Sequence, residues 1–532
     1  MSEKAVLSEN PAQTSQVNSK PLQTETEVFA VYGAEPEVQA YAMAKYSRSA
    51  LSMKESLREL NDQKAEKFLN TFYFQYGHRS IADLAHVALA VEKLSLLAAI
   101  ALVDEQRWDG QERSTRYQNF QKSGYYTPEF GGNEPATELY QDAIGDLFQH
   151  YRALSETVFQ FLASRTPKPE DMKQDAYERT LRARAFDITR YLLPLATNTS
   201  LGEIVNARTL ETQVSRLLSD PHEEIRRLGE LLKRAASQPA WNLNQDRYRD
   251  LVNRLREKDE ALANEAGDLL LKDVRVSPTL VKYAEPNAYQ IDARRELAAA
   301  ASEVMAGDAI ESAKLVDLLE DEPLEIELAT TLLYEHCHYP YRQLRQKVEA
   351  LAEKRRAEII GIGIRLRGRH DELLRAYCSG QKFRFDILMD IGGFRDMHRH
   401  RRCVQIVQDF TTQHGFDTPE EILAAGAGEE YMQAMQRAAE ASSHLRSLLG
   451  GGEAAEEKSE YLIPLAYRKR TLFKMDLAEA VYISELRSKP EGHISYRRVA
   501  YAMYEEVIGR YPALAEMFRV RDINEPVDLL KR

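Results

Sequence analysis

The sequence predicts a helix-rich α+β protein in which one domain occurs twice. The chain has 532 residues, and single hydrophobic cores stop growing near ~250–300 residues, so at least two domains are expected. Over most of the chain, apolar residues recur every three or four positions, which is typical of amphipathic helices. Short motifs of the first half also return in the same order in the second half, and this order indicates a duplication.

The predicted helices follow from this spacing of apolar residues. The clearest one runs from Leu139 to Leu162, where Ile144, Leu147 and Tyr151 stand on one face. The same spacing predicts further helices over residues 224–235, 250–271, 310–335, 341–360 and 430–449. Strands are fewer. Apolar runs at 28–32 and 279–283 are each followed by a Glu-Pro turn signal, which is typical of the end of a strand.

The predicted division of the chain follows its composition. Residues 1–26 are polar and carry neither periodicity nor an apolar signal core, so we expect a disordered tail. A first domain is expected over residues 27–245, a helical linker over 246–275 and a second domain over 276–525. The longest largely apolar segment, residues 94–103, is shorter than the ~18 residues of a membrane span, so no such span is predicted.

The duplication rests on repeated motifs. Tyr-Leu-Leu-Pro-Leu-Ala at 191–196 returns as Tyr-Leu-Ile-Pro-Leu-Ala at 461–466, an offset of 461 − 191 = 270 residues. The segment that ends at His78 is echoed by the segment that ends at His338, an offset of 338 − 78 = 260 residues. With the two Glu-Pro turns, these motifs keep one order, and so long an offset indicates a tandem domain rather than a solenoid. The alternative is two unrelated helical domains that share short apolar strings.

The charge balance restricts the classes of partner. A formal net charge of −12 disfavours binding to bulk nucleic acid or to an anionic membrane, but allows a local basic site for a phosphorylated ligand. The chain has three cysteines, Cys337, Cys378 and Cys403. An odd number in a long chain indicates reduced thiols in the cytoplasm rather than a disulfide framework.

A first candidate ligand site is the segment Glu-Arg-Ser-Thr-Arg-Tyr at 112–117. If this segment is extended, Glu112, Ser114 and Arg116 point to the same face, because side chains alternate along a strand. A carboxylate, a hydroxyl and a guanidinium on one face suit a ligand with a phosphate and hydrogen-bonding edges. An exposed strand with its own salt bridge is the alternative.

A second candidate site is the run Arg-Asp-Met-His-Arg-His-Arg-Arg at 395–402, which lies between the apolar segments 387–393 and 403–407. A basic cluster between two buried segments is expected to face an anion, such as the phosphates of a nucleotide or cofactor, although a solvated basic run is possible. The histidines at 336, 338, 398 and 400 form two His-x-His pairs. Because the adjacent arginines would repel a cation, and no carboxylate stands at a recognised ligand spacing, no metal site is predicted.

Motifs of several other catalytic classes are absent from the sequence. There is no Gly-x-Ser-x-Gly elbow, and none of the cysteines lies in a recognised nucleophile signature. There is also no Gly-x-Gly-x-x-Gly and no P-loop, so side chains such as arginine would have to hold a nucleotide.

The motifs of the first half resemble those of the flavin-dependent thymidylate synthases. From Val28 to about Arg226 they are Gly77-His78-Arg79-Ser80, Glu112-Arg113-Ser114-Thr115-Arg116-Tyr117, Arg190 before Leu193-Pro194-Leu195, and Asn206-Ala207-Arg208-Thr209-Leu210. Their order and spacing match the family over some two hundred residues. The main departure is Asp104-Glu105-Gln106, which stands where the family has Arg-His-Arg.

The second half departs from the family in the opposite way. It keeps Arg399-His400-Arg401, His338, Ile463-Pro464-Leu465 and Leu486-Arg487. The counterparts of Glu112, Ser114 and Arg116 are Val407, Asp409 and Thr411, Glu460 replaces Arg190, and Asp476 and Ala478 replace Asn206 and Arg208. Each half alone is therefore degenerate, whereas the two halves together are complementary.

The resemblance implies a fold, a reaction and an assembly. The fold is two tandem thymidylate synthase-like domains, each with helices packed on a small antiparallel sheet. The reaction is methylation of deoxyuridylate to thymidylate, with methylenetetrahydrofolate as carbon donor, FAD as cofactor and NADPH as reductant. Family members are tetramers with sites between subunits, so one composite site made from both halves and a homodimer that forms a pseudo-tetramer are expected. Whether the composite site lies within one chain or between two chains is left open by the sequence.

The resemblance also implies roles for individual residues. The substrate-binding residues are expected to be Glu112, Ser114, Arg116, Arg190 and Arg399. The cofactor-binding residues are expected to be His78, Ser80, Asn206, Arg208, His338, Arg399, His400 and Arg401. Arg487, or alternatively Arg216, is expected to polarise the pyrimidine ring during catalysis.

Other departures keep two further functions open. Asp83 and Leu84 stand where the family has Glu-His, and Asp396 stands where it has a glutamine that contacts the pyrimidine. The substrate could therefore be another pyrimidine nucleotide, or the protein could be a homologue that binds flavin or nucleotide without turnover. A colourless purified protein would favour a third alternative, a purely structural helical protein.

Overall fold

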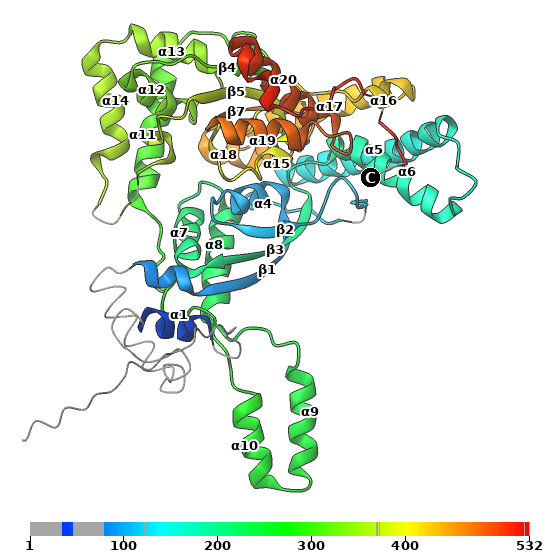
Figure 1. Ribbon diagram of the computed structural model, residues 1–532, viewed down its shortest axis with the longest axis vertical. Coiled ribbons are helices and arrows are strands. Elements are labelled where there is room, and N and C mark those ends of the chain that lie inside the picture. The colour runs from blue at the N-terminus through cyan, green and yellow to red at the C-terminus, as the bar shows by residue number, and fades with distance from the viewer. Residues whose placement is uncertain are drawn as a thin grey trace, which may run out of the picture.

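The computed structural model describes residues 35–45, 79–121, 123–368, 371, 373–525 and 527–530. The predicted tail over 1–26, the predicted strand at 28–32 and His78, which is expected to bind the cofactor, lie outside these ranges. The described part is rich in helices and contains two small antiparallel sheets (Figure 1). The prediction of a helix-rich α+β fold is confirmed.

The first half begins with α1 and ends with α8. Its elements are α1 (Pro36–Lys45), η2 (Arg79–Leu84), β1 (His86–Ser95), α4 (Leu96–Val103), β2 (Asp109–Glu112), α5 (Glu134–Arg165), α6 (Gln174–Thr189), η3 (Arg190–Leu192), β3 (Asn198–Asn206), α7 (Ala207–Leu218) and α8 (Glu223–Ser237). The connection to the second half contains α9 (Gln245–Arg256) and α10 (Glu260–Leu270). This connection projects from the body of the molecule as a hairpin (Figure 1).

The second half begins with α11. Its elements are α11 (Ala288–Val304), β4 (Val316–Leu318), α12 (Leu324–Tyr334), α13 (Tyr341–Ala350), α14 (Glu353–Arg365), η4 (Arg375–Tyr377), β5 (Phe383–Asp390), α15 (Ile391–Met397), β6 (Val404–Val407), α16 (Glu420–Ala424), α17 (Gly428–Leu448), α18 (Glu453–Glu460), β7 (Arg468–Met475), α19 (Leu477–Arg487), α20 (Ile494–Arg510) and η5 (Pro512–Met517).

The two sheets repeat one arrangement. The first has the order β1-β3-β2, and the second has the order β4-β5-β7-β6, so β5, β7 and β6 take the places of β1, β3 and β2. All the pairings are antiparallel. The helix after each of two equivalent strands is capped alike. Asn206 accepts from Thr209 N at the start of α7, and Asp476 accepts from Glu479 N at the start of α19.

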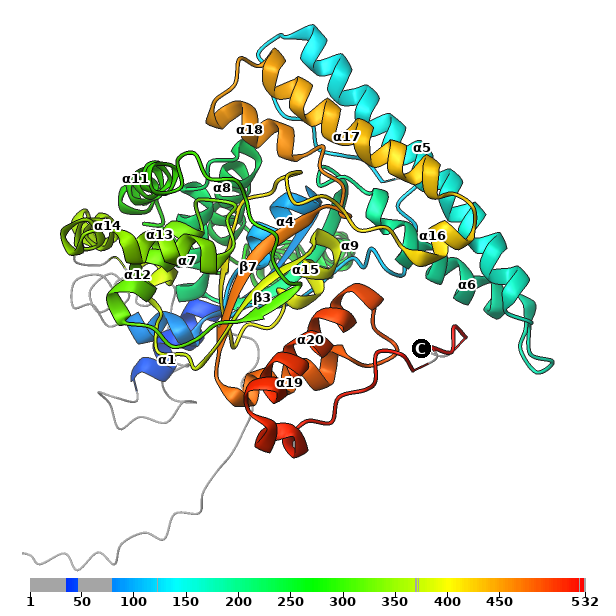
Figure 2. The same ribbon diagram turned by 90° about the horizontal axis from the view of Figure 1, so that it is seen from above.

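The repeated Leu-Pro-Leu segments pair with each other across the molecule. Leu195 N donates to Ile463 O at 2.9 Å, and Leu465 N donates to Leu193 O at 3.0 Å. The long helices α5 and α17 also pack side by side (Figure 2). One hydrophobic core runs through this junction, since it includes Leu195 and Leu465 together with residues of both sheets. The two halves are therefore joined along equivalent surfaces.

Several predicted elements are wrong in their extent. Residues 279–283 form turns rather than a strand, because the buried Glu37 carboxylate accepts hydrogen bonds from Thr279 N and Leu280 N and curls the chain around it. The predicted helix over 310–335 starts only at Leu324, after Pro323, and is preceded by β4. The helices predicted over 250–271 and 341–360 are each interrupted, at residues 257–259 and 351–352.

Among the described residues, no helix is both long enough and apolar enough to span a bilayer. The thiols of Cys337, Cys378 and Cys403 are free.

Candidate functional site

Arg116 lies in a turn after β2, buried between the two halves. The chain is not extended here: Arg116 N donates to Ser114 Oγ at 3.2 Å, so the predicted alternation of Glu112, Ser114 and Arg116 along a strand is wrong. The guanidinium donates to both oxygens of Asp187, at 3.0 and 3.1 Å. It also donates to Tyr496 OH at 2.8 Å, and Tyr496 belongs to the second half. The turn thus places Arg116 at the junction between the two halves.

Arg190 directly precedes the paired segment of the first half and is only 1% exposed. Its Nη1 lies 3.3 Å from Asp396 of the second half, and its Nε lies 3.9 Å from Asp187. Nε and Nη2 make no hydrogen bond with any described residue. A Cβ at Gly392 would lie 3.4 Å from Nε, so the glycine leaves room for this arginine. Asp396 and Asp187 therefore hold Arg190 in place, and its Nε and Nη2 have no hydrogen-bond partner among the described residues.

Glu112, at the end of β2, binds two arginines of the basic run. Arg395 Nη2 donates to Glu112 Oε1, and Arg399 Nη2 lies 3.5 Å from Glu112 Oε2. Arg395 Nη1 also donates to Thr115 Oγ1 at 3.1 Å. The first predicted segment and the second predicted segment therefore meet in one chain, although 283 residues separate Glu112 from Arg395.

Arg487, in the last turn of α19, completes the group. Its Nε donates to His400 Nε2 at 2.8 Å, so this ring nitrogen is unprotonated. Burial and the neighbouring Arg487 lower the pKa of His400, although Glu479 opposes them. The ring centroid of Tyr496 lies 5.4 Å from the Arg116 guanidinium and 5.5 Å from that of Arg487. Both arginines therefore stack on one aromatic ring.

We call this group the arginine cluster. It consists of Arg116, Arg190, Arg395, Arg399 and Arg487 with Glu112, Asp187 and Asp396. Burial alone would raise the pKa of Asp396, but Arg190 and Arg116 together with Arg487 and Arg399 hold it below its usual value. His493 is neutral at pH 7, because burial and Arg190 lower its pKa to about 3. Five guanidinium groups and three carboxylates leave a formal charge of +2.

The comparisons with known proteins identify the family. The model of the family described as thymidylate synthase complementing protein matches residues 29–240 and 314–513, which is most of the chain. The chain belongs to the flavin-dependent thymidylate synthase family. The family model matches once in each half, in agreement with two tandem copies of a flavin-dependent thymidylate synthase-like domain.

Some relatives align over most of this chain, and another aligns over about a third of it. A UPF0159 protein of Chlamydia pneumoniae is 28% identical over 95% of this chain and 93% of its own length. A UPF0159 protein of Thermoplasma acidophilum is 25% identical over 91% of this chain and 95% of its own length. A flavin-dependent thymidylate synthase of Clostridium tetani is 27% identical over 34% of this chain and 68% of its own length.

Among solved structures, a flavin-dependent thymidylate synthase of Helicobacter pylori complexed with FAD and dUMP is 17% identical. It covers 38% of this chain and 89% of its own, with a TM-score of 0.24.

Other residues that the family resemblance singles out lie in different surroundings. Asn206 caps α7, and Arg208 Nη1 lies 3.3 Å from Asp83, the acid that replaces the family's glutamate. Arg401 Nη2 donates to Asp109 at 2.9 Å. Ser80 belongs to η2, and its side chain lies outside the described part of the structure.

Two further residues that were expected at the site, His338 and Arg216, make contacts with residues outside the arginine cluster. The His338 ring stacks edge-on against His414, with centroids 6.1 Å apart, and burial lowers its pKa. Arg216 donates to Ala101 O at 2.9 Å and lies 4.0 Å from Glu105. Of the two candidates for polarising the pyrimidine, Arg487 is the one that joins Arg116 and Arg190.

The sequence did not single out Asp187, Arg395 as a partner of Glu112, His493 or Tyr496. Asp187 lies three residues before Arg190 and could have been found as its helical neighbour. Tyr496 is 380 residues from Arg116, and only the fold brings the two together.

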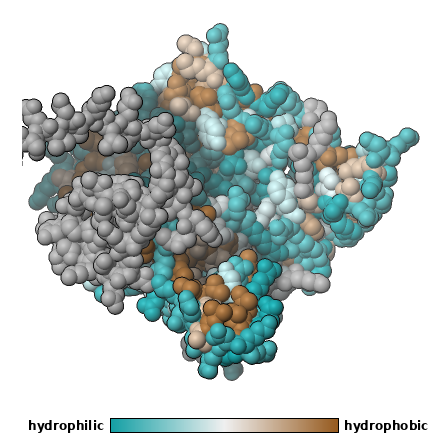
Figure 3. Space-filling model, turned by 60° about the horizontal axis from the view of Figure 1, so that its bottom comes forward, coloured by the Kyte–Doolittle hydropathy of each residue, from teal (hydrophilic) through white to brown (hydrophobic). Residues whose placement is uncertain are grey.

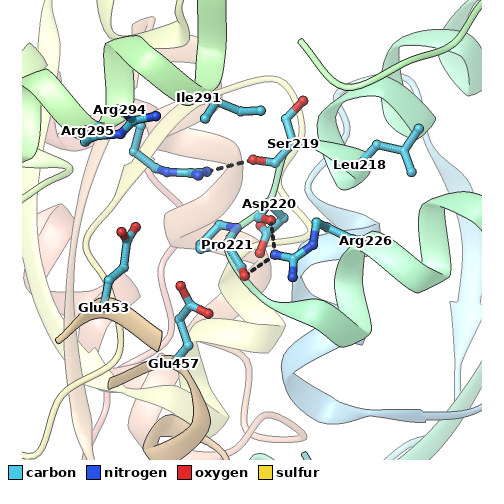
Figure 4. A pocket seen from close by; sticks show the side chains of 10 residues that line it. All are labelled: Leu218, Ser219, Asp220, Pro221, Arg226, Ile291, Arg294, Arg295, Glu453 and Glu457. Carbon is cyan, nitrogen blue, oxygen red and sulfur yellow. Dashed lines mark hydrogen bonds between the residues drawn. The ribbon is translucent and has the colours of Figure 1, made fainter. Parts of the chain in front are cut away.

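The equivalent position in the other half carries acids. Glu460, the counterpart of Arg190, lies 3.2 Å from His222 Nε2, and Asp220 lies 2.9 Å from His222 Nδ1. Although burial opposes protonation, these two carboxylates raise the pKa of His222. A neighbouring cavity of about 260 Å³ is shown in Figure 4, where Glu453 and Glu457 point toward it from α18. Arg226, Arg294 and Arg295 also line this cavity.

The described residues contain no group of three or more His, Cys, Asp or Glu side chains that could hold a metal ion. His398 is instead hydrogen-bonded to Gln405 at 2.8 Å and His400 to Arg487.

Proposed function

We propose that the arginine cluster is the nucleotide site of an enzyme that methylates deoxyuridylate to thymidylate. FAD would be the cofactor, and methylenetetrahydrofolate and NADPH would be co-substrates. The observation that carries the proposal is the cluster itself: the family's substrate residues, divided between two degenerate halves, meet within one chain. The relative solved with FAD and dUMP supports this ligand pair for a family member.

The charge of the cluster supports a phosphate ligand. A phosphate monoester carries close to two negative charges at pH 7, and the cluster has a formal charge of +2. Arg190 keeps two buried donors, Nε and Nη2, without a hydrogen-bond partner in the described structure. Because charge-assisted hydrogen bonds from arginine favour planar oxyanions, these donors are well suited to a phosphate. Asp187 and Asp396 then hold the arginines in position before the ligand binds.

The pyrimidine ring is assigned to the side of the cluster near Arg487. The Arg487 guanidinium is held in position by His400 and by the Tyr496 ring. Its positive charge is therefore preorganised for a pyrimidine oxygen that gains negative charge during the reaction. The absence of a nucleophile motif from the sequence agrees with a reaction in which the protein supplies position and charge. The reduced flavin would supply the hydride, and the folate the carbon.

The surroundings of the cluster also suit a flavin nucleotide. Arg399 and Arg401 are partly exposed, and they pair with Glu112 and Asp109 respectively. The remaining donors of these two side chains could bind the diphosphate of FAD. Arg208, Asn206, Ser80 and His78 are proposed to hold the rest of the nucleotide, as the family resemblance implies.

Flavin absorbance and tritium release test the proposal. The purified full chain is expected to bind FAD and to release tritium from 5-tritiated deoxyuridylate when NADPH and methylenetetrahydrofolate are supplied. Arg116→Gln is expected to lower the rate by ~100-fold or more, since it removes a positioned charge. Arg113→Gln is the matched control, because Arg113 binds Gln118, Ser123 and Asn119 O outside the cluster.

Asp396 supports a second candidate, a homologue that binds flavin and nucleotide without turnover or acts on another pyrimidine nucleotide. Its carboxylate stands where the family has a glutamine, and it already pairs with Arg190. Flavin binding without any spectral response to deoxyuridylate, and without tritium release, would select this candidate. A cytoplasmic location, the homodimer and the domain boundaries at 27–245, 246–275 and 276–525 stay predictions.

A further inference from the structure

The helices α9 and α10 form a hairpin that stands apart from both halves. Its base is closed by the bridge between Pro239 and Arg275 and by Ala240 N donating to Val274 O at 2.8 Å. Beyond this base, α9 packs against α10, and neither helix packs closely against another described element (Figure 1). Within the two helices only Val252 and Ala263 are buried. The hairpin is thus poorly stabilised by its own packing.

The hairpin exposes large apolar side chains. Trp241 is 83% exposed, Leu243 75% and Leu269 74%. Leu262 is also exposed and lies seven residues before Leu269, so the two leucines share one face of α10. Figure 3 shows apolar residues gathered on this projecting part of the molecule. Helices of 11 or 12 residues are marginal in water without tertiary packing, and a contiguous exposed apolar surface is typical of an interface.

The two helices carry opposite charges. In α9, four arginines and two aspartates give a net charge of 4 − 2 = +2. In α10, two glutamates and one aspartate give a net charge of −3. A partner of uniform charge would be repelled by one of the two helices. A second hairpin of the same kind, related by a two-fold axis parallel to the helices, places α9 on α10 and α10 on α9, so both contacts are attractive.

We propose that the hairpin is an interface between two copies of this chain, in which two hairpins pack as an antiparallel four-helix bundle. The interface would bury the exposed face of Leu262 and Leu269 against the same hairpin of the second copy. It lies apart from the arginine cluster, so it is independent of the proposed catalytic function. The occupant follows from the self-complementary charge, because a partner of uniform charge would match only one of the two helices.

Sedimentation equilibrium of the full chain tests the apolar part of the interface. The native protein is expected to be a dimer at micromolar concentration. The double variant Leu262→Gln/Leu269→Gln is expected to raise the dimer dissociation constant by ~100-fold or more, because four leucines leave the interface. Leu324→Gln/Leu423→Gln is the control, since these leucines are similarly exposed in α12 and α16, and it should leave the constant unchanged. A monomeric native protein, or a dimer unaffected by the first pair, would overturn the proposal.

Charge reversal tests the partner directly. Reversing α9 (Arg247→Glu/Arg249→Glu/Arg254→Glu) gives two acidic helices, and reversing α10 (Glu260→Lys/Glu265→Lys/Asp268→Lys) gives two basic helices. Each variant alone is expected to be monomeric, whereas an equimolar mixture forms a heterodimer. The chain with both reversals restores attraction within and between hairpins and should dimerise again. Circular dichroism verifies that this chain keeps its helices. Failure of both the mixture and the doubly reversed chain to dimerise, with helices intact, would refute self-docking.

Discussion

Replacing Arg190 by glutamine is the most direct perturbation of the proposed phosphate site. The side chain is 1% exposed and offers Nε and Nη2 without a hydrogen-bond partner among the described residues. A hydrogen bond to a charged group contributes ~1.5–3 kcal/mol. Losing at least one such bond to the ligand should weaken deoxyuridylate binding by ~10- to 150-fold. We therefore expect a large loss of affinity from a single buried residue.

The same substitution should also affect stability, because it leaves Asp396 with fewer cations. Removing one partner of a buried ion pair costs ~3–5 kcal/mol, and the other arginines that lower the pKa of Asp396 should reduce this cost. Adding Asp396→Asn removes the unpaired acid, so the double variant should recover much of the stability but not the affinity. The two effects of Arg190 can thus be separated.

Isothermal titration of the flavin-loaded protein with deoxyuridylate measures the affinity, and thermal unfolding measures the stability. Arg182→Gln is the control, because Arg182 lies in α6, which ends directly before Arg190, but forms an exposed ion pair with Glu156 at 2.9 Å. Its affinity should match that of the native protein. If Arg190→Gln folds and binds deoxyuridylate within about twofold of the native protein, the cluster does not bind the phosphate.

Three further results are expected. Co-expressed Arg116→Ala and Arg399→Ala chains should recover no activity by exchanging subunits, because Glu112 and Arg399 meet within one chain; recovery to about a quarter of native activity or more would require a site between chains. Burial raises the pKa of Glu457 to about 7, so the folded state binds more protons than the unfolded state between about pH 4.5 and 7, and stability falls over this range as pH rises. Glu457→Gln should therefore gain roughly 1 kcal/mol at pH 8, discounted for partial exposure, and almost nothing below pH 4.5, measured by urea unfolding beside the exposed control Glu456→Gln. Glu37→Ala should lose about 1–3 kcal/mol, because it leaves the amides of Thr279 and Leu280 unpaired; unchanged urea unfolding would contradict this account of the turn.

The parts of the fold that the sequence predicted well are local. The spacing of Leu139, Ile144 and Leu162 is enough to predict α5, because an amphipathic helix is determined by its own residues. The duplicated Leu-Pro-Leu motif is visible as a repeat, but its pairing with the other copy is not, since those hydrogen bonds join residues 270 positions apart. The apolar run at 279–283 predicted a strand. The turn found there could not be predicted, because the acceptor of its amides, Glu37, is more than 240 residues away.

The candidate site shows the same limit. Arg116, Arg190, Arg399 and Arg487 were identified from motifs, and the fold brings them together. Asp187 was not identified, and neither was the pairing of Glu112 and Asp396 with these arginines, because pairing depends on the junction between the halves. Asp396 stands where the family has a glutamine, and in the structure it pairs with Arg190. Motifs thus indicate which cations are present, and only the packing shows how they are balanced.

Positions 190 and 460 can carry different residues because one chain contains two copies of the domain. In an oligomer of identical single domains, one substitution changes every site, so an acid in place of Arg190 would remove them all. In this chain the two positions are encoded separately, although both precede equivalent segments that pair across the junction. Glu460 is held by His222, whose protonated form is stabilised by Asp220 on its other side. An arginine at 460 would add a cation beside His222 and Lys469, where Asp220 and Asp409 are the neighbouring carboxylates. Glu460 is therefore balanced by His222 and Lys469, so replacing it by arginine would change the charge of both pairings.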